Sequence, residues 1–419
     1  MEDFVMVETL DNYDPYLKTI SKHVDALGDD LRKVSLEIHD HPELQYKEFH
    51  AHDILTKYLA TQPGWEVTSS AYEIETAFVA VFDSGTTGPT ISFNAEYDAL
   101  KGIGHACGHN LIAIASVGAA LAAAKTVAES HLSGKIMLFG TPAEEGGGGK
   151  IRLLDAGAYK GVDVSLISHP GITPNAALMR TAAYAGFKVE YFGKEAHAAA
   201  APWQGINALD ALVTAYNAIS VLRQQTQPGD IIQGHITNGG LRPNIIHAYS
   251  AGVFVVRSDN RSRLEALKTR VLKCFDAAAL ATGATLKVTP KGAYDDHMPN
   301  KALAACYRSA FNTLGGDIPS PELDWIAGST MASTDQGNVS HRMPSISPGF
   351  WIRSESRDGQ QLGGPHTPDF EKATRTEESH RIALKVAKAL AATGLEVLTR
   401  SELLREVKRE FNEMKKRHI

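Results

Sequence analysis

The apolar residues of roughly the first 170 positions switch repeatedly between helical spacing and short β-rich runs, and this alternation constrains the fold more than any other feature. Helical spacing covers residues 15–59 and is broken at Pro42. Strand-like runs follow at 76–82, 90–94, 134–140 and 162–167, with helical segments at 111–127 and 151–156 among them. This order predicts an α/β domain in which helices flank a mixed sheet.

The middle of the chain has a different pattern. Two helical segments, 207–223 and 261–281, are mixed with strand-like runs at 186–192, 231–236, 245–257 and 285–289. From about residue 300 the first pattern returns. We therefore expect residues 183–297 to form an α+β domain inserted into a domain built from residues 1–182 and 298–419. Residues 401–419 predict a charged amphipathic helix that lies in solvent.

Composition narrows the class of protein. A chain of 419 residues exceeds one ordinary core, and a net charge of −6 gives no basic excess for nucleic acid. Three cysteines do not make a disulfide framework, and the N-terminal residues lack the apolar core of a signal peptide. Residues 111–127 are apolar but Ala-rich, which favours a buried core helix over a membrane span. We expect a cytoplasmic protein that binds neither nucleic acid nor membranes.

A thiol and two imidazoles lie together in the Gly-bounded loop HACGHN, residues 105–110. Cys107 and His109 are two residues apart, and a thiolate and an imidazole at this spacing can bind one metal ion. His105 is an equally good ligand by spacing, so the sequence leaves the choice between the two histidines open. A buried cysteine beside a structural histidine is the alternative interpretation.

Two adjacent carboxylates, Glu144 and Glu145, follow a predicted strand in the segment TPAEEGGGGK. One of the two can bind metal while its neighbour stays free as a general base. The glycine run suggests a phosphate loop, but Lys150 is followed by Ile151 where that loop requires Ser or Thr. The pair therefore favours hydrolytic chemistry over nucleotide binding.

Three further histidines occupy positions near chain breakers or strand ends. His169 lies in SHPG, His197 lies among small residues in the middle segment, and His366 lies in GGPHTPDF. A lone histidine such as His169 is more often structural, and His197 is equally well explained as a surface histidine, whereas His366 between its chain breakers is a candidate ligand from a loop. Together with Cys107 and the carboxylate pair they fit a dinuclear hydrolase by ligand count, because the spacings of zinc fingers, zinc deaminases and HExxH proteases are absent.

The chain contains, in this order, NAEYDALKGIGHACGHN, TPAEEGGGGK, SHPG, GKEAHAAAAPWQG, LRPN, STDQGNVS and PHTPDF. This series resembles the dinuclear zinc aminoacylase/carboxypeptidase family of metallopeptidases. The greatest similarity is to its amidohydrolase subgroup, in particular to aminobenzoyl-glutamate hydrolases and β-alanyl-lysine dipeptidase-like proteins. The resemblance spans roughly residues 30–395, which is almost the whole chain.

The resemblance implies a fold and a metal centre. The fold is a catalytic α/β domain with an inserted α+β lid that also forms a homodimer. Two divalent metal ions, zinc first with manganese or cobalt as alternatives, would be bridged by Cys107. Glu144 would act as the general base. The other metal ligands that the family implies are His109, Glu145, His169 and His366.

Further residues are implied around the substrate. His197 would reach the active site of the partner subunit and polarise the scissile carbonyl. Asn244 in LRPN and Arg257 in VVRS match positions that bind the substrate's carbonyl or carboxylate, and Asp98 matches an acid that supports the ligands. The implied reaction is metal-dependent hydrolysis of an amide bond in a dipeptide or N-acyl amino acid with a free carboxylate.

Several positions depart from the family pattern. Glu96 and Asn110 stand where many subgroup members have Asp. Lys101 replaces a common proline, which places a lysine near the mouth of the site. Asp335 lies in a loop and is a candidate for supporting the site, with an ordinary structural role as the alternative. These departures leave the substrate open.

Two other functions are compatible with the same fold. One is a biosynthetic enzyme that forms or transfers an amide, and the other is a catalytically inert binding paralog. Trp203, Trp325 and Trp351 are predicted core residues, with a pocket for an aromatic acyl group as the alternative.

Overall fold

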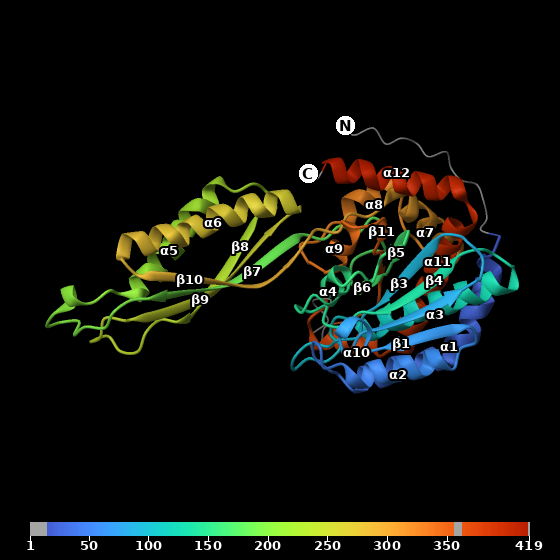
Figure 1. The fold of residues 1–419 in the computed structure, drawn as a ribbon, viewed down its shortest axis with the longest axis horizontal. Coiled ribbons are helices and arrows are strands. Elements are labelled where there is room, and N and C mark those ends of the chain that lie inside the picture. The colour runs from blue at the N-terminus through green and yellow to red at the C-terminus, as the bar shows by residue number, and fades with distance from the viewer. Residues whose placement is uncertain (1–14, 356–362, 418–419) are drawn as a thin grey trace.

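The computed structural model describes residues 15–355 and 363–417, which form a larger and a smaller unit (Figure 1). The N-terminal residues, for which no signal peptide is predicted, lie outside the described residues. The last two residues of the predicted tail helix also lie outside them.

The larger unit is built on a six-stranded mixed sheet. Its strands are β1 (Trp65–Ser69), β2 (Phe78–Asp83), β3 (Thr90–Ala95), β4 (Lys135–Gly140), β5 (Val164–Leu166) and β11 (Ser345–Ile346). A separate two-stranded sheet consists of β6 (His169–Gly171) and β12 (Gly349–Trp351). The strand order is β1-β2-β4-β3-β5-β11. The four strands from β4 to β11 are parallel to one another, whereas β2 pairs antiparallel with both of its neighbours, β1 and β4. Strand β6 pairs with β12 in a separate parallel ladder. The predicted α/β class with a mixed sheet is confirmed.

Helices cover both faces of this sheet because side chains alternate along each strand. In β2, Phe78 and Ala80 join the main core with the long helices, whereas Val79 joins a second core with α4 and α9 on the other face. The helices of this unit are α1 (Leu17–Asp40), α2 (Phe49–Ala60), α3 (His109–Glu129), α4 (Gly149–Asp155), α7 (Lys301–Thr313), α8 (Pro321–Ala327), α9 (Gln336–Ser340), α10 (Pro368–Thr374), α11 (Glu377–Thr399) and α12 (Ser401–Arg417).

Helix α3 is the centre of the main core. It packs against α1, α11 and the sheet, and every residue from 109 to 124 is buried. Among the described residues it is the one helix long and apolar enough to cross a membrane, yet 89% of its most apolar window is buried inside the protein. The prediction of a buried core helix at 111–127 is therefore confirmed.

The smaller unit is a four-stranded antiparallel sheet with two helices on one face. Its elements are β7 (Ala183–Phe192), α5 (Ala208–Leu222), β8 (Ile231–Asn238), β9 (Tyr249–Ser258), α6 (Arg261–Thr282) and β10 (Thr285–Tyr294). The strand order is β10-β7-β9-β8, and the unit has an apolar core of its own. The chain enters through β7 and leaves through β10, which pair with Tyr184 opposite Tyr294. The unit therefore projects from the larger one on two neighbouring strands (Figure 1).

Two parts of the larger unit differ from the sequence-based expectation. Strand β1 is an edge strand with mostly exposed side chains, so it has no apolar alternation by which it could be predicted. Helix α12 is amphipathic as expected, but it does not simply lie in solvent. Leu403 and Val407 are buried in the main core, and Glu410 accepts hydrogen bonds from the backbone at the start of α7.

Candidate metal centre

The Cys107 loop reaches β6 because the next residue is a glycine. Gly108 has φ +81°, and a Cβ added there would lie 2.5 Å from Cγ of Pro170. A larger residue would therefore strain the backbone and push the loop away from β6. With glycine in place, Sγ of Cys107 lies 3.4 Å from Nε2 of His169, the first residue of β6.

His109 is the first residue of α3, and its ring is fixed by an acid. Nδ1 of His109 lies 3.0 Å from Oδ1 of Asp98, whose other oxygen accepts the Glu145 backbone N–H at 3.0 Å. Burial raises the pKa of Asp98, but the charge and hydrogen bond of His109 outweigh this and leave that pKa below its usual value. Asp98 is therefore a carboxylate that positions two predicted ligands at once.

His105, the alternative to His109, takes no part in this arrangement. It belongs to none of the groups of potential ligand atoms found among the described residues. Burial lowers the pKa of His105 to about 3, so its ring is neutral. The geometry places His109 at the centre, where spacing alone gave no preference.

The loop after β4 brings the carboxylate pair to the same place. Oε1 of Glu145 lies 3.3 Å from Nε2 of His366 and 3.8 Å from Nε2 of His109. The loop is held by the hydroxyl of Tyr294, which donates to the backbone oxygen of Glu144 at 2.7 Å and accepts from the Gly148 N–H at 3.2 Å. Tyr294 is the last residue of β10, so the lid strand ends on the loop of the carboxylate pair.

His366 lies at the exposed side of the centre. Its backbone has φ 67°, a left-handed conformation, and its N–H donates to the carbonyl of Ala106 at 2.8 Å. This bond ties the segment of His366 to the Cys107 loop from the far end of the chain. The adjacent carboxylate of Glu145 raises the pKa of His366 despite partial burial.

The donor atoms fit two divalent ions. One group is formed by Cys107, His109 and His169, and a second by Cys107, Glu145 and His366, so the thiol is common to both. Two nitrogen or oxygen atoms bound at about 2.1 Å to one zinc ion in tetrahedral geometry lie about 3.4 Å apart, and a sulfur bound at about 2.3 Å lies about 3.6 Å from such a nitrogen. The 3.3 Å between Glu145 and His366 and the 3.4 Å between Cys107 and His169 are close to these separations. Sulfur, imidazole and carboxylate donors together suit zinc.

Unpartnered polar atoms point to the same conclusion. Nε2 of His109 and Oε1 of Glu145 are buried and have no hydrogen-bond partner among the described residues. Buried polar atoms are rarely left in this state unless an ion or water satisfies them. A different group, Glu37, His41 and His50, lies mainly exposed between α1 and α2 and shares no residue with the buried set.

Glu144 is buried beside this centre. Its Oε2 lies 3.9 Å from Nε2 of His109, and its side chain belongs to neither of the two groups that share Cys107. Burial raises the pKa of Glu144 well above its usual value, and the nearby carboxylates of Glu96 and Glu145 raise it further. A carboxyl with an elevated pKa next to a metal site suits proton transfer.

The other predicted residues lie in the lid. His197 and Asn244 are exposed neighbours, joined by the bond from the Ala198 N–H to the Asn244 carbonyl at 3.0 Å. The segment between β7 and α5 that carries His197 lies at the end of the lid away from the larger unit (Figure 1). Arg257 lies at the root of the lid, where it donates to Met331 O and Ser333 Oγ, both at 3.1 Å. The structure of one chain thus brings together the predicted metal ligands, Asp98 and Glu144, but not His197 or Asn244.

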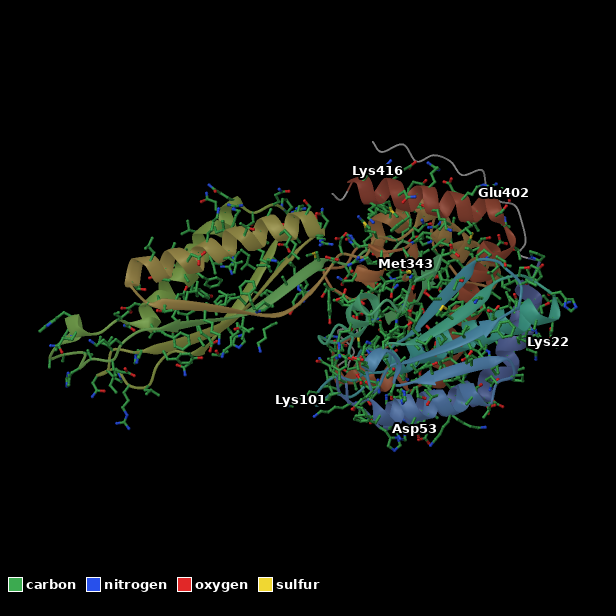
Figure 2. The ribbon with its side chains drawn as sticks, in the orientation of Figure 1. Lys22, Asp53, Lys101, Met343, Glu402 and Lys416 are labelled. Atoms are coloured by element: carbon green, nitrogen blue, oxygen red, sulfur yellow. The ribbon has the colours of Figure 1, made fainter. Side chains whose placement is uncertain are left out.

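The sequence did not predict that Lys150 lies beside the metal centre. Lys150, considered only as part of a phosphate loop, is completely buried and contacts Glu96 and Asp335. Burial lowers the pKa of Lys150, but these two carboxylates outweigh it and keep the lysine charged. By contrast Lys101 is exposed, at the periphery of the larger unit (Figure 2).

The three tryptophans do not gather in one place. The prediction of a core position is wrong for Trp203, which is largely exposed in the lid, and Trp351 is half-buried on β12. Trp325 packs partly against the main core under the guanidinium of Arg180, whose Cζ lies 4.0 Å from the ring centroid. The described structure therefore gives no common aromatic pocket built from these three residues.

Comparison with known proteins agrees with this geometry. The sequence model of the family described as peptidase family M20/M25/M40 matches residues 83–393. The Xaa-Arg dipeptidase of Homo sapiens is 40% identical over 93% of this chain and 90% of its own length. A p-aminobenzoyl-glutamate hydrolase chain of Escherichia coli is 28% identical over 90% of this chain and 91% of its own.

Solved structures show the same fold. A dinuclear metal-binding peptidase of the M20 family from Bacillus subtilis has a TM-score of 0.65 at 18% identity, over 89% of this chain and 99% of that one. An aminobenzoyl-glutamate utilization protein from Klebsiella pneumoniae has a TM-score of 0.66 at 18% identity, over 91% and 99% of the two chains.

Proposed function

The chain belongs to the peptidase family M20/M25/M40 and is a metal-dependent hydrolase, and from this premise we propose that it cleaves dipeptides with a basic C-terminal residue, arginine first. The observation that carries the substrate proposal is the similarity, over nearly the whole of both chains, to the human Xaa-Arg dipeptidase. A dipeptide with a free C-terminal carboxylate is also the substrate class that the sequence motifs imply.

We also propose which metal ions are bound and which residues bind them. Zinc is supported by the mixed sulfur, nitrogen and oxygen donors, with manganese and cobalt as the alternatives. Bound there, two divalent ions supply Lewis acidity, which polarises a substrate carbonyl and acidifies water. The proposed ligands are Cys107, His109, Glu145, His169 and His366.

Glu144 is the proposed general base. Its buried carboxyl lies beside the metal ligands but is free of both groups that share Cys107, so it can take a proton from the attacking water. The same group then delivers the proton to the leaving amine, which must be protonated before it departs. The Tyr294 hydroxyl keeps the Glu144 backbone in place during both steps.

We further propose that the lid forms a homodimer and that His197 acts in the partner's site. Nδ1 of His197 accepts the N–H groups of Ala199 and Ala200 at 3.2 and 3.1 Å, which places the ring proton on Nε2. An exposed N–H of this kind can donate to the oxyanion that forms on the substrate carbonyl. Asn244 beside it, and Arg257 at the lid root, are proposed to bind the substrate's carbonyl and carboxylate.

The exposed apolar surface of the lid supports the dimer. Strand β8 is one of the two edge strands of the lid sheet and carries Ile236, which is 42% exposed, while Val213 and Tyr216 are similarly exposed on α5. An unpaired edge strand beside exposed apolar side chains is a surface that another chain can cover. A cytoplasmic location is also proposed, since all three cysteines, Cys107, Cys274 and Cys306, are free.

The test is hydrolysis of a substrate panel by zinc-reconstituted protein. The panel contains Xaa-Arg and Xaa-Lys dipeptides, dipeptides with acidic or apolar C-terminal residues, and N-acyl amino acids. We expect cleavage of Xaa-Arg that stops with a chelator and returns with zinc. Preference for another C-terminal residue would contradict the substrate proposal alone. Condensed product from free amino acids, without hydrolysis, would favour the amide-forming alternative.

A further inference from the structure

A cluster of three buried charges lies beside the metal centre. Nζ of Lys150 is 2.6 Å from Oε1 of Glu96 and 2.5 Å from Oδ1 of Asp335. The other oxygen of Asp335 accepts the Lys150 backbone N–H at 2.9 Å. All three side chains are almost completely buried. A buried ammonium requires such partners, but a single carboxylate in good geometry would suffice to pair its charge.

Glu96 has one oxygen that this cluster does not use. Its Oε2 is buried and has no hydrogen-bond partner within the described part of the chain. It lies 3.5 Å from Nε2 of His109, which is buried and unpartnered as well. Potential ligand atoms of Glu96, His109 and Glu144 lie within 4.8 Å of one another. A metal ion bound between these two unpartnered ligand atoms would satisfy both of them.

The spacing agrees with a shared ion. Two donors at about 2.1 Å from one metal in tetrahedral geometry are about 3.4 Å apart, close to the 3.5 Å between Glu96 and His109. The pair of Cys107 and His169 has almost the same separation, 3.4 Å. The Glu96 side chain thus spans from Lys150 on one side to the imidazole of a metal ligand on the other.

We propose that Glu96 supplies a further ligand oxygen to the metal ion held by His109, and that Lys150 and Asp335 are positioning residues that hold its carboxylate. This rests on the metal centre proposed above and extends its ligand set. Lys150 occupies one carboxylate oxygen, so Glu96 binds the ion through the other. The ammonium also offsets the negative charge that a carboxylate adds to a site already containing Cys107 and Glu145.

Two matched substitutions separate this role from a purely structural one. Glu96→Gln and Asp335→Asn each remove one negative charge from a buried contact with Lys150, but only Glu96 faces His109. Zinc affinity is measured by competition with a chromophoric chelator, and circular dichroism verifies the fold. We expect Glu96→Gln to weaken one zinc ion by at least about 10-fold more than Asp335→Asn does. Equal affinities of the two folded variants would overturn the proposal.

A second measurement applies even if Glu96→Gln does not fold. In a crystal structure of the wild-type protein with zinc, we expect an oxygen of Glu96 at about 2.0–2.2 Å from one ion. Zinc held by the Cys107 groups, with Glu96 more than about 3.5 Å away, would overturn this proposal and leave the metal centre intact. Zinc absent from the site would overturn both.

Discussion

His109 uses its two ring nitrogens for two different purposes. Nδ1 pairs with Asp98 at 3.0 Å, and this contact leaves Nε2 free to face the carboxylates. A metal-binding imidazole usually has its other nitrogen bonded in this way, because the bond sets the orientation of the ring. Since Asp98 also accepts the Glu145 N–H, one buried acid aligns a proposed ligand from α3 with a proposed ligand from the loop after β4.

The metal content of two variants should differ because Cys107 is common to both ligand groups, whereas His366 belongs to one. We expect Cys107→Ala to lose both zinc ions and His366→Ala to keep one. Elemental analysis of the dialysed proteins measures this directly. A Cys107→Ala protein with its full complement of zinc would contradict the bridging role.

Replacing the proposed base should separate chemistry from metal binding. Glu144→Gln keeps the shape of the side chain but cannot take up the proton of the attacking water. We expect kcat to fall by about 100- to 10,000-fold while zinc content and KM stay close to those of the wild type. Steady-state kinetics and elemental analysis of the same preparation provide both numbers. Retention of more than about a tenth of kcat would contradict the assignment.

The sequence could suggest the ligands because thiol, imidazole and paired carboxylates near chain breakers have a recognisable chemistry. Spacing alone could not choose between His105 and His109, since the choice depends on which ring faces Asp98, and only the resemblance to the family pointed to His109. The sequence also missed Lys150, because the contact joins three segments that are distant in the chain. A lysine directly after a glycine run is unremarkable until the fold brings carboxylates to it.

At the scale of elements, the turn between α1 and α2 supports the loop of the carboxylate pair. Oε1 of Glu48, the residue before α2, accepts the N–H groups of Tyr46 at 3.0 Å and Ala143 at 2.9 Å. The hydroxyl of Tyr46 donates to the Gly147 carbonyl at 2.7 Å. Both contacts flank Glu144 and Glu145 in sequence, so the first two helices help to fix the loop.

The burial of the Glu48 carboxyl makes the stability of the protein depend on pH. Burial, followed by the charge of Asp98, raises the pKa of Glu48 to about 7 from 4.5. Between these two pKa values the folded state binds more protons than the unfolded state. The stability of the protein therefore falls as the pH rises from about 4.5 to about 7. Glu48→Gln keeps an acceptor oxygen but does not titrate. Relative to this variant, we expect the unfolding free energy of the wild type to fall by up to about 3 kcal/mol as the pH rises.

The measurement for Glu48 is urea unfolding of both proteins at several pH values from 4.5 to 8. The difference in unfolding free energy between variant and wild type should grow in favour of the variant up to about pH 7 and then level off. Parallel curves over the whole range would show that the pKa of Glu48 is not raised by folding.

Elements were predictable where one face is buried and unpredictable where it is not. The buried strands β3 and β4 lie within a residue of their predicted limits, because β4 contains a continuous apolar run and β3 has apolar residues at every second position. Edge strand β1 has mostly exposed side chains and gives no such signal. The helix predicted for the C-terminal residues is present at 401–417. Its charged composition gave no indication that its apolar side packs against α7.

At the scale of the whole molecule, the proposed catalytic residues are divided between two places. The proposed metal ligands gather in the larger unit, whereas the segment that carries His197 lies at the far end of the lid (Figure 1). If His197 takes part in catalysis, the contact must come either from closure of the same chain or from a second copy. The exposed apolar residues of β8 and α5 favour the second copy.

Mixed dimers distinguish these two routes. Glu144→Gln and His197→Ala proteins should each be nearly inactive alone. If His197 serves the partner's site, a mixed dimer contains one doubly defective site and one intact site. Random pairing of equal amounts of the two chains should then restore about a quarter of wild-type activity. Co-expression with two different affinity tags, followed by sequential purification, isolates the mixed dimer, which has one intact site of two and should show about half of wild-type activity.

The control combines two variants whose substitutions both lie at the metal centre of their own chain. In a mixed dimer of Glu144→Gln with Cys107→Ala, each site carries one defect in its own chain, so no intact site can form. We expect this pair to remain inactive at the concentration at which the His197 pair regains activity. Inactivity of both pairs, with the mixed dimer verified by its two tags, would contradict an action of His197 across the interface. Activity in both pairs would show that the defects are not confined to single sites.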